Sequence, residues 1–320
     1  MGKIIVLCQM EDSQVNRISL EALSGARQLA TATGHTLQAA LFGPGDPPVE
    51  LAGADIVEII QLPNAELADY SPDYYVAAAA ALIAAEQPEL LVTGHTYEIR
   101  DWLPRLAARL GRPLVSDCIG VRDAGAGRWV RPVFQGKITA DVQTSPGLVL
   151  VSFQSGTYRA DELGSGSPSV RTVSVDLSGV ESRVHREEKF QEAKGAVDLS
   201  RAERIVAVGR GIGEEENLQL VRDLAEALGA EIASSRPVVD YGWLDHDRQV
   251  GSSGQTVAPK LYLALGISGA IQHQVGMKNA GCIVAINKDA NAPIFEIADY
   301  GIVGDLFDYV PALIKALNGR

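Results

Sequence analysis

The stretch from residue 259 to residue 306 constrains the fold more than any other part of this chain. Its pattern predicts an apolar strand, a glycine turn, a helix and a second apolar strand, followed by a loop rich in Asn, Asp and Pro. Ligands of open parallel sheets lie beyond the carboxyl ends of the strands. A helix that begins after residues 266–269 would point free backbone N–H groups at such a ligand, which favours an anion. With Gln272 and His273 in the first helical turn, the stretch indicates a nucleotide cofactor site beside a titratable group.

The composition of the chain excludes several classes of function. Its 320 residues are more than one core usually fills, so two domains are expected. A net charge of −12 argues against nucleic-acid binding and against adsorption to anionic lipid, since both require basic surface. No run of about 18 apolar residues predicts a membrane span, and no targeting leader precedes the first predicted strand at residue 3. We therefore expect a cytoplasmic protein.

The three cysteines, Cys8, Cys118 and Cys282, are scattered through or beside apolar runs. An odd and sparse set does not make a disulfide framework, and no pair has the CxxC spacing of a metal site. We expect all three to be buried thiols.

Strands and helices alternate along most of the chain, which predicts an α/β fold of two domains. An N-terminal α/β domain with a mostly parallel sheet is expected over 1–180, with some antiparallel strands at one edge. The charged stretch 181–201 is expected to be a linker, and a C-terminal domain with a parallel, nucleotide-binding sheet is expected over 202–320. In the N-terminal domain the predicted strands are 3–9, 36–43, 55–62, 89–94, 113–123, 128–144, 147–156 and 170–177, and the predicted helices are 19–34, 74–86 and 99–110.

A glycine-rich turn follows the first predicted strand of the C-terminal domain, within 204–213. Its glycines at 209, 211 and 213 do not form a strict GxGxxG, and such a turn also occurs as a plain connection between strand and helix. Arg210 inside the turn favours a binding role, because a guanidinium among closely spaced backbone N–H groups suits a pyrophosphate.

A long connection, 236–259, contains no clear strand or helix pattern, and connections of this length are usually functional or disordered. Gly251 and Gly254 would allow close approach of the backbone to a ligand. Polar side chains in this connection or directly before it could donate or accept hydrogen bonds: Ser235, Arg236, Gln249, Ser252 and Ser253.

His273 could be an ordinary helix histidine, but its position in the first helical turn favours donation of a hydrogen bond to a ligand whose charge changes. For His95, which also follows a strand end, we expect a structural role. The sequence contains no GxSxG, HExxH or P-loop motif, no Cys/His cluster and no evident carboxylate pair. No catalytic residue and no metal ligand is therefore predicted.

Taken together, these motifs resemble the alpha subunit of electron transfer flavoprotein. The resemblance covers essentially the whole chain and is strongest after residue 204. In the N-terminal half it includes Ser116-Asp117-Cys118 and Arg131-Pro132. In the C-terminal half it rests on the segments 208–211, 235–237, 249–251, 259–273, 283–289 and 293–306. One departure is Ser252-Ser253, where many members of that family have Gln-Thr.

The resemblance implies that the C-terminal domain binds FAD. By motif position, Arg236 would lie over the isoalloxazine ring and His273 near its pyrimidine oxygen, where both would stabilise negative charge and raise the reduction potential. Arg210 and Ser235 would bind the phosphate side, and Asn287, Asp305 and Leu306 the adenosine end. The full set of expected cofactor-binding residues is Arg210, Ser235, Arg236, Gln249, Val250, Gly251, Ser252, Ser253, Ser268, Gly269, Ala270, Ile271, Gln272, His273, Asn287, Asp305 and Leu306.

The same resemblance implies a heterodimer with a beta subunit that holds AMP or a second FAD. The expected function is an electron shuttle from flavin dehydrogenases, such as the acyl-CoA dehydrogenases of fatty acid β-oxidation, to a quinone reductase. One alternative is the alpha subunit of an electron-bifurcating, NADH-oxidising relative, with which residues 236–243 could agree. A less favoured alternative is an NAD-dependent enzyme of similar fold, for which Lys278 and Lys288 are candidates by location only.

Overall fold

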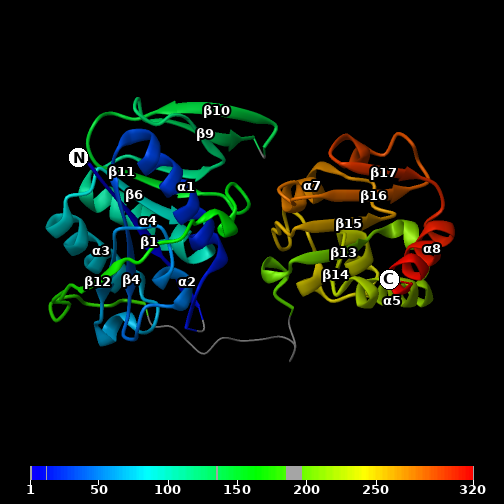
Figure 1. The fold of residues 1–320 in the computed structure, drawn as a ribbon, viewed down its shortest axis with the longest axis horizontal. Helices are drawn as coiled ribbons and strands as arrows, with labels where there is room; N and C mark the ends of the chain where they lie inside the picture. The colour runs from blue at the N-terminus through cyan, green and yellow to red at the C-terminus, as the bar shows by residue number, and fades with distance from the viewer. Residues whose placement is uncertain (1, 12, 135, 185–196, 320) are drawn as a thin grey trace. The chain divides into compact units, whose positions relative to one another are not determined.

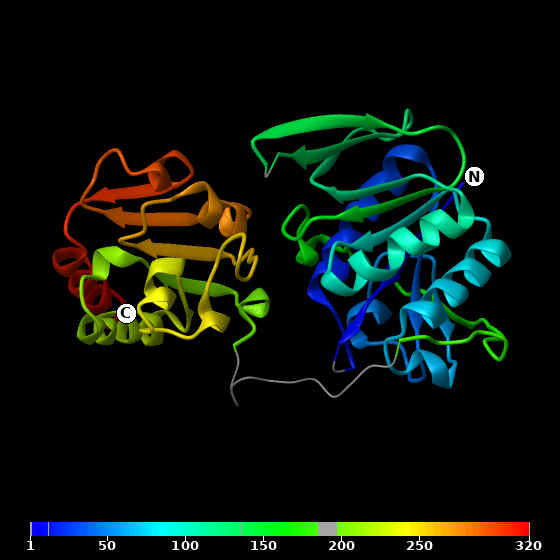
Figure 2. The same cartoon turned by 180° about the vertical axis from the view of Figure 1, so that it is seen from behind.

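The computed structural model describes residues 2–184 and 197–319, apart from residues 12 and 135. Its contacts divide the chain into two compact units, Met1–Lys189 and Phe190–Arg320. Most of the expected linker, 181–201, lies outside the described residues. In each unit, helices pack on a mainly parallel sheet, as Figure 1 and the reverse view in Figure 2 show. The predicted fold class is therefore confirmed.

Seven strands form the main sheet of the N-terminal unit: β1 (Lys3–Cys8), β4 (Thr36–Phe42), β5 (Glu58–Leu62), β6 (Leu90–Gly94), β7 (Leu114–Cys118), β11 (Val149–Phe153) and β12 (Ser169–Thr172). Their order is β12-β5-β4-β1-β6-β11-β7, and all neighbours run parallel. A short antiparallel pair, β2 (Met10–Glu11) and β3 (Gln14–Val15), follows β1.

The helices of this unit are α1 (Arg17–Thr33), α2 (Val49–Ala52), α3 (Pro72–Glu86) and α4 (Tyr97–Leu110). Asn16 caps the start of α1 by accepting a hydrogen bond from the Ile18 N–H, and Gly34 ends it in a left-handed conformation. Thr96 caps the start of α4, since its side chain accepts a hydrogen bond from the Ile99 N–H. The buried residues of α1 belong to one hydrophobic cluster and those of α3 and α4 to another.

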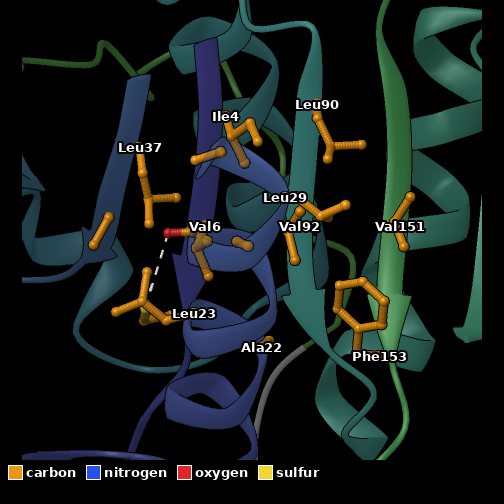
Figure 3. Packing of buried hydrophobic residues seen from close by; sticks show 14 of the residues in the cluster. Ile4, Val6, Ala22, Leu23, Leu29, Leu37, Leu90, Val92, Val151 and Phe153 are labelled. Carbon is orange, nitrogen blue, oxygen red and sulfur yellow. Dashed lines mark hydrogen bonds between the residues drawn. The ribbon is translucent and has the colours of Figure 1, made fainter. Parts of the chain in front are cut away.

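The inner strands of this sheet, such as β1, β6 and β11, are buried on both faces, as expected for a parallel sheet between helices, whereas the edge strand β12 is mostly exposed. Alternate residues of β1 point to opposite sides, so that Val6 joins the cluster of α1 and Leu7 joins the cluster of α3 and α4. Figure 3 shows Leu23 and Leu29 of α1 packed against strand residues such as Val92. Two layers of helix therefore hold the carboxyl ends of the strands in fixed positions.

The antiparallel strands β8 (Gly120–Asp123), β9 (Arg128–Val133) and β10 (Ile138–Gln143) form a separate sheet. The prediction that they lie at an edge of the parallel sheet is wrong, as is the prediction of single strands over 113–123 and 128–144. The first run is bulged at Asp117, which has a φ of 60°, and its two strands separate at Ile119. The second run ends its first strand at Val133, and the next residue, Phe134, turns the chain with a φ of 52°.

Five strands form the sheet of the C-terminal unit: β13 (Arg204–Val208), β14 (Glu231–Ser234), β15 (Leu261–Leu265), β16 (Ile283–Asn287) and β17 (Tyr300–Val303). Their order is β14-β13-β15-β16-β17, with all neighbours parallel. The helices are α5 (Leu218–Leu228), α6 (Arg236–Asp240), α7 (Ile271–Met277) and α8 (Leu306–Asn318). Helices α5 and α8 share one hydrophobic cluster, and α7 packs in the other.

The expected loop over 236–259 is more ordered than its sequence pattern indicated. It begins with α6, which Pro237 helps to start from its first turn, and it contains a short 3₁₀ turn over His246–Arg248. Across the described parts of the chain, every helix is too short or too polar to cross a bilayer. Cys8 and Cys118 are buried as predicted, whereas Cys282 is partly exposed, so the prediction is wrong for that residue.

Candidate functional site

A cavity of about 670 Å³ lies at the carboxyl ends of the strands in the C-terminal unit. The chain passes from β13 to β14 on one side and then to β15 on the other side of β13, so the strand order reverses between β13 and β15. Such a reversal leaves a crevice in which ligands of α/β sheets bind. The connections after β13, β14 and β15 contribute residues to the cavity, as does Asn287 at the end of β16.

Close contact between two glycine turns forms the floor of this crevice. The Gly211 N–H donates a hydrogen bond of 3.0 Å to the Gly266 carbonyl. A Cβ atom on Gly211 would lie 2.7 Å from the Gly266 Cα, and one on Gly209 would lie 2.4 Å from the Gly266 carbonyl oxygen. Gly266 itself has a φ of 59°, which favours glycine. Both turns therefore need glycine to meet at the end of the sheet.

A loop over residues 249–255 forms one wall and is held by backbone hydrogen bonds. Ser252 N–H donates to the carbonyl of Gln272 in α7 at 2.8 Å, and Gln255 N–H donates to the Gln249 carbonyl at 2.7 Å. The buried Gln249 side chain donates from Nε2 to the Ser253 hydroxyl at 3.0 Å. This bond leaves the Ser253 hydroxyl hydrogen free to point at a ligand.

The electrostatic character of the cavity is cationic. Arg210 and Arg236 both line it, and no Asp or Glu is among the described lining residues. Arg236 carries an ion pair with Asp240, Nε to Oδ2 at 3.4 Å, but both side chains are mostly exposed. Within the described part of the chain Arg210 forms no ion pair. The lining also offers serine hydroxyls and the amides of Gln272 and Asn287, so the donor set suits an anionic, polar ligand.

His273 is buried in the cavity wall, with 6% of its surface exposed. Its Nε2 is 2.9 Å from the hydroxyl of the fully buried Tyr262. Burial lowers the pKa of His273 to about 4, an effect that the Val250 backbone opposes only in part. The imidazole is therefore neutral at neutral pH, and it can donate one hydrogen bond without carrying charge.

Asn287 braces the turn that follows β15. Its Nδ2 donates to the Ile267 carbonyl at 2.9 Å, and its Oδ1 accepts from the Asp289 N–H at 3.0 Å. Nearby, Asp305 caps α8 and accepts from Lys288 Nζ at 2.8 Å, and this hydrogen bond lowers the pKa of Asp305. Lys288 is thus paired with a carboxylate and does not line the cavity.

The segment that enters the C-terminal unit is fastened to the 249–255 loop by one side chain. Gln255 accepts from the Leu199 N–H at 2.9 Å through Oε1 and donates to the Val197 carbonyl at 2.8 Å through Nε2. The Val197 N–H also donates to the Asp247 carboxylate at 2.7 Å. The wall of the cavity and the start of the unit are therefore connected directly.

The structure brings together nearly all of the expected binding residues. All of them line the cavity except Gly269, Ile271, Asp305 and Leu306. Leu306 is buried in the core beside α8, and Ile271 is half exposed at the start of α7. Their binding roles stay predictions, as do those of the lining residues. Four further residues line the cavity that were not among those expected: Gly211, Pro237, Gly266 and Ile267. The two glycines follow strand ends, and that position in the sequence was a usable signal for them.

Comparison with known proteins gives two matches to family domains. The electron transfer flavoprotein domain matches residues 4–178, and the electron transfer flavoprotein FAD-binding domain matches residues 198–278. The chain is 37% identical to the electron transfer flavoprotein subunit alpha of Thermoanaerobacterium thermosaccharolyticum, over 98% of this chain and 97% of that protein. It is also 37% identical to the subunit alpha of Bacillus subtilis, over 99% of each chain. A third relative, the lactate dehydrogenase (NAD(+),ferredoxin) subunit LctC of Acetobacterium woodii, is 34% identical over 96% of this chain and 75% of that protein.

Proposed function

Because this chain belongs to the electron transfer flavoprotein alpha-subunit family, we propose that it holds FAD in its C-terminal cavity and carries electrons between other proteins. The observation that carries the proposal is the cavity itself. It lies at the switch point of a parallel sheet, and the described residues that line it supply two guanidinium groups and several hydroxyl groups but no carboxylate. These features suit the phosphates of a dinucleotide.

The residues present fit FAD in two further respects. The glycine turns at 209–211 and 266 leave no side chain between the strand ends and a pyrophosphate. The donor set of serine hydroxyls, amides and arginines matches the polar groups of a dinucleotide. Bound FAD supplies the chemistry, since its isoalloxazine ring accepts and releases one or two electrons.

The chain's own residues would bind and tune this group. We assign Arg210 and Ser235 to the phosphates, and Arg236 and His273 to the ring. A guanidinium that is always charged stabilises negative charge on a nearby ring, and a neutral imidazole can stabilise it by donating a hydrogen bond. Both effects raise the reduction potential.

An NAD-dependent enzyme of similar fold would need a base or a nucleophilic lysine at the cavity. Lys278 and Lys288 do not line it, and Lys288 is paired with Asp305. These positions support an electron carrier over a substrate-converting enzyme.

The partners follow from the same proposal. We propose a heterodimer with a beta subunit that holds AMP, with flavin dehydrogenases such as the acyl-CoA dehydrogenases of fatty acid β-oxidation as donors and a quinone reductase as acceptor. The cytoplasm is the proposed compartment. The expected roles of Gly269, Ile271, Asp305 and Leu306 at FAD also belong to this proposal.

The first test is coexpression with a beta-type subunit, followed by absorption spectroscopy and counting of the released nucleotides. The proposed shuttle contains one FAD and one AMP per heterodimer. A colourless complex would refute the proposal, and two FAD per heterodimer would replace the simple shuttle with the electron-bifurcating alternative.

A second test measures the reduction potential of the bound FAD. Arg236→Gln should lower it by roughly 60 mV, a tenfold change in a one-electron equilibrium. Asp240→Asn removes the ion partner of Arg236 and should shift the potential in the opposite direction. Arg222→Gln, on the exposed surface of α5, is the matched control and should leave it unchanged. Equal potentials in all four proteins would contradict the assignment of Arg236 to the ring.

A further inference from the structure

The N-terminal unit contains a second cavity, of about 280 Å³, at the carboxyl ends of β6, β7 and β11. Its polar lining comes from five different parts of the fold: His95 after β6, Arg100 in α4, Ser116 and Asp117 in β7, Ser152 in β11 and Arg131 in β9. It lies at the same edge of a parallel sheet as the C-terminal cavity does in its own unit. Its volume is less than half of the other, which is too small for a dinucleotide.

A local irregularity in the sheet forms one side of this cavity. Between β7 and β11 the register passes from Val115 opposite Val151 to Cys118 opposite Phe153. Two residues of β7, Ser116 and Asp117, therefore stand opposite Ser152 alone, which is a β-bulge. Bulges of this kind re-aim side chains, and here Ser116, Asp117 and Ser152 all reach the cavity lining.

Positive charge in this cavity is not neutralised by ion pairs. Neither Arg100 nor Arg131 has an acidic partner within ion-pair distance among the described residues. The Arg131 Nε is buried and forms no hydrogen bond to any residue that the structure describes. Arg100 lies 5.2 Å from the ring centre of Tyr97, which orients its guanidinium without neutralising it. A buried guanidinium nitrogen without a partner is costly, so a ligand that accepts from it would be stabilised.

The remaining polar groups bind one another and exclude a nucleophilic role. His95 Nδ1 is 2.8 Å from the Ser152 hydroxyl, which also accepts from the Asp117 N–H at 3.1 Å. His95 Nε2 lies 3.9 Å from Asp117 Oδ1. Burial, with Arg100 and Arg131 adding to it, lowers the pKa of His95 to about 4 and keeps its ring neutral. Ser152 is fully buried, and its hydroxyl is already bound to His95 and to the Asp117 N–H, so it orders the cavity lining.

We propose that this cavity is a binding site for an oxyanion of phosphate or carboxylate size, held by the guanidinium groups of Arg100 and Arg131. The Ser116 hydroxyl and the neutral His95 ring complete the lining. Two guanidinium groups face a single carboxylate, Asp117, so the site favours an anion over a cation. The oxyanion comes either from a free solute or from an acidic side chain of the beta subunit.

The test uses the FAD-loaded heterodimer, in which the C-terminal cavity is filled, and titrates inorganic phosphate by calorimetry at constant ionic strength. If the oxyanion is a free solute, phosphate binds saturably and Arg131→Gln weakens it by about tenfold, as expected for loss of one charge-assisted contact. Arg100→Gln weakens it less, because Arg100 is exposed. Arg128→Gln, on the exposed face of the same strand, leaves it unchanged.

If the oxyanion belongs to the beta subunit, free phosphate does not bind the heterodimer, and Arg131→Gln instead raises the dissociation constant of the two subunits by about tenfold. Arg131→Lys keeps the positive charge but loses the planar set of donors of the guanidinium. In either case its dissociation constant should lie between those of the wild type and Arg131→Gln, which a folding defect in Arg131→Gln alone would not explain. The proposal is overturned if neither phosphate binding nor subunit association responds to Arg131→Gln in a folded complex. That outcome leaves FAD binding, and hence the proposed function, untouched.

Discussion

The two units use the same architecture at the point where a ligand would bind, and they differ in whether that point is open. In the N-terminal sheet the strand order reverses between β1 and β6, as it does between β13 and β15 in the C-terminal sheet. The N-terminal position is filled: the Gln9 N–H donates to the Ser19 hydroxyl at 2.9 Å, and Thr96 donates to the Gln9 side chain. A Cβ on Gly94 would lie 2.8 Å from the backbone of Ile18, so the start of α1 closes the gap.

The C-terminal position stays open because its connections end in glycines that contact only each other. Gly211 and Gly266 meet below the cavity and leave the space above them free. Strand topology therefore offers a crevice in both units, and the connections decide which one can hold a cofactor. The predictions below test this difference, from the largest effect to the smallest.

The largest effect is expected from closing the open crevice. Gly211→Ala places a Cβ 2.7 Å from the Gly266 Cα and should destabilise the C-terminal unit by about 3 kcal/mol and abolish FAD retention. Gly53→Ala in the N-terminal unit, where nothing lies within 4 Å of the added atom and φ is −106°, is the control and should change little.

The measurement for this prediction is urea unfolding followed separately in each unit. Trp102 and Trp129 report on the N-terminal unit and Trp243 on the C-terminal unit, so Trp→Phe backgrounds isolate each signal. Unchanged FAD content and an unchanged Trp243 transition in Gly211→Ala would show that the glycine contact does not keep the crevice open.

Acid should weaken both units through one buried histidine each. Burial lowers the pKa of His95 and of His273 from 6.5 to about 4, so the unfolded chain binds protons that the native units do not. The free energy of unfolding of each unit therefore falls as the pH drops from roughly 6.5 towards 4. At about pH 5 each of the two units has lost about 2 kcal/mol relative to neutral pH.

His95→Asn should flatten this acid dependence only in the N-terminal unit, and His273→Asn only in the C-terminal unit. The tryptophan signals described above, recorded at several pH values, check the assignment. A variant whose own unit keeps the wild-type slope would show that another group is responsible.

A smaller effect is expected inside the wall of the cavity. Ser253→Ala removes the acceptor of the Gln249 Nε2 hydrogen bond and should cost the C-terminal unit about 1 kcal/mol, with a several-fold weaker affinity for FAD. Ser252→Ala is the comparison variant: it leaves the Gln249 hydrogen bond and the backbone bond of residue 252 to α7 in place, so its FAD affinity should fall less. Equal FAD affinities in the two variants would show that the hydrogen bond from Gln249 to the Ser253 hydroxyl does not contribute to FAD binding.

The smallest effect is expected from an ion-pair network in the N-terminal unit. Arg171 donates to both oxygens of Glu58 at 2.9 Å and to Glu86 at 2.8 Å. Its side chain is 40% exposed, so solvent screening limits the loss in Arg171→Met to less than about 1 kcal/mol, and added salt should reduce it. The Trp243 transition should not move. An equal loss at low and high salt would assign the effect to packing of the Arg171 stem.

The sequence predicted what depends on local pattern and on strand ends. The alternation of strands and helices gave both sheets, and residues next to strand ends, such as Arg210, Ser235 and Asn287, converge on the cavity because parallel strands end at one edge. Helix α6 was missed although Ser235 followed by Arg236-Pro237 is a typical helix start. Its five residues are too few to show a hydrophobic period.

Other features could not be predicted because they depend on contacts distant in the sequence. Asp117 adopts a left-handed conformation that few non-glycine residues take, and the strand pattern around it is unbroken. The positions of His95 and Arg131, which lie far apart in the chain, are set by the sheet edge and the separate antiparallel sheet. The end of the strand at Val133 could have been predicted, because a single strand over 128–144 would have been unusually long.

The hydrogen bonds of Gln255 determine where the C-terminal unit can be cut from the rest of the chain. A fragment that starts at residue 202, the expected domain boundary, would lack Val197 and Leu199 and leave both ends of the Gln255 amide without those partners. Since Gln255 also holds Gln249 and Gly251 through its backbone, the loss of these two bonds would loosen the loop that lines the C-terminal cavity. A fragment that begins before Val197 keeps both Gln255 hydrogen bonds. A difference of a few residues in the starting point should therefore decide how tightly the fragment binds FAD.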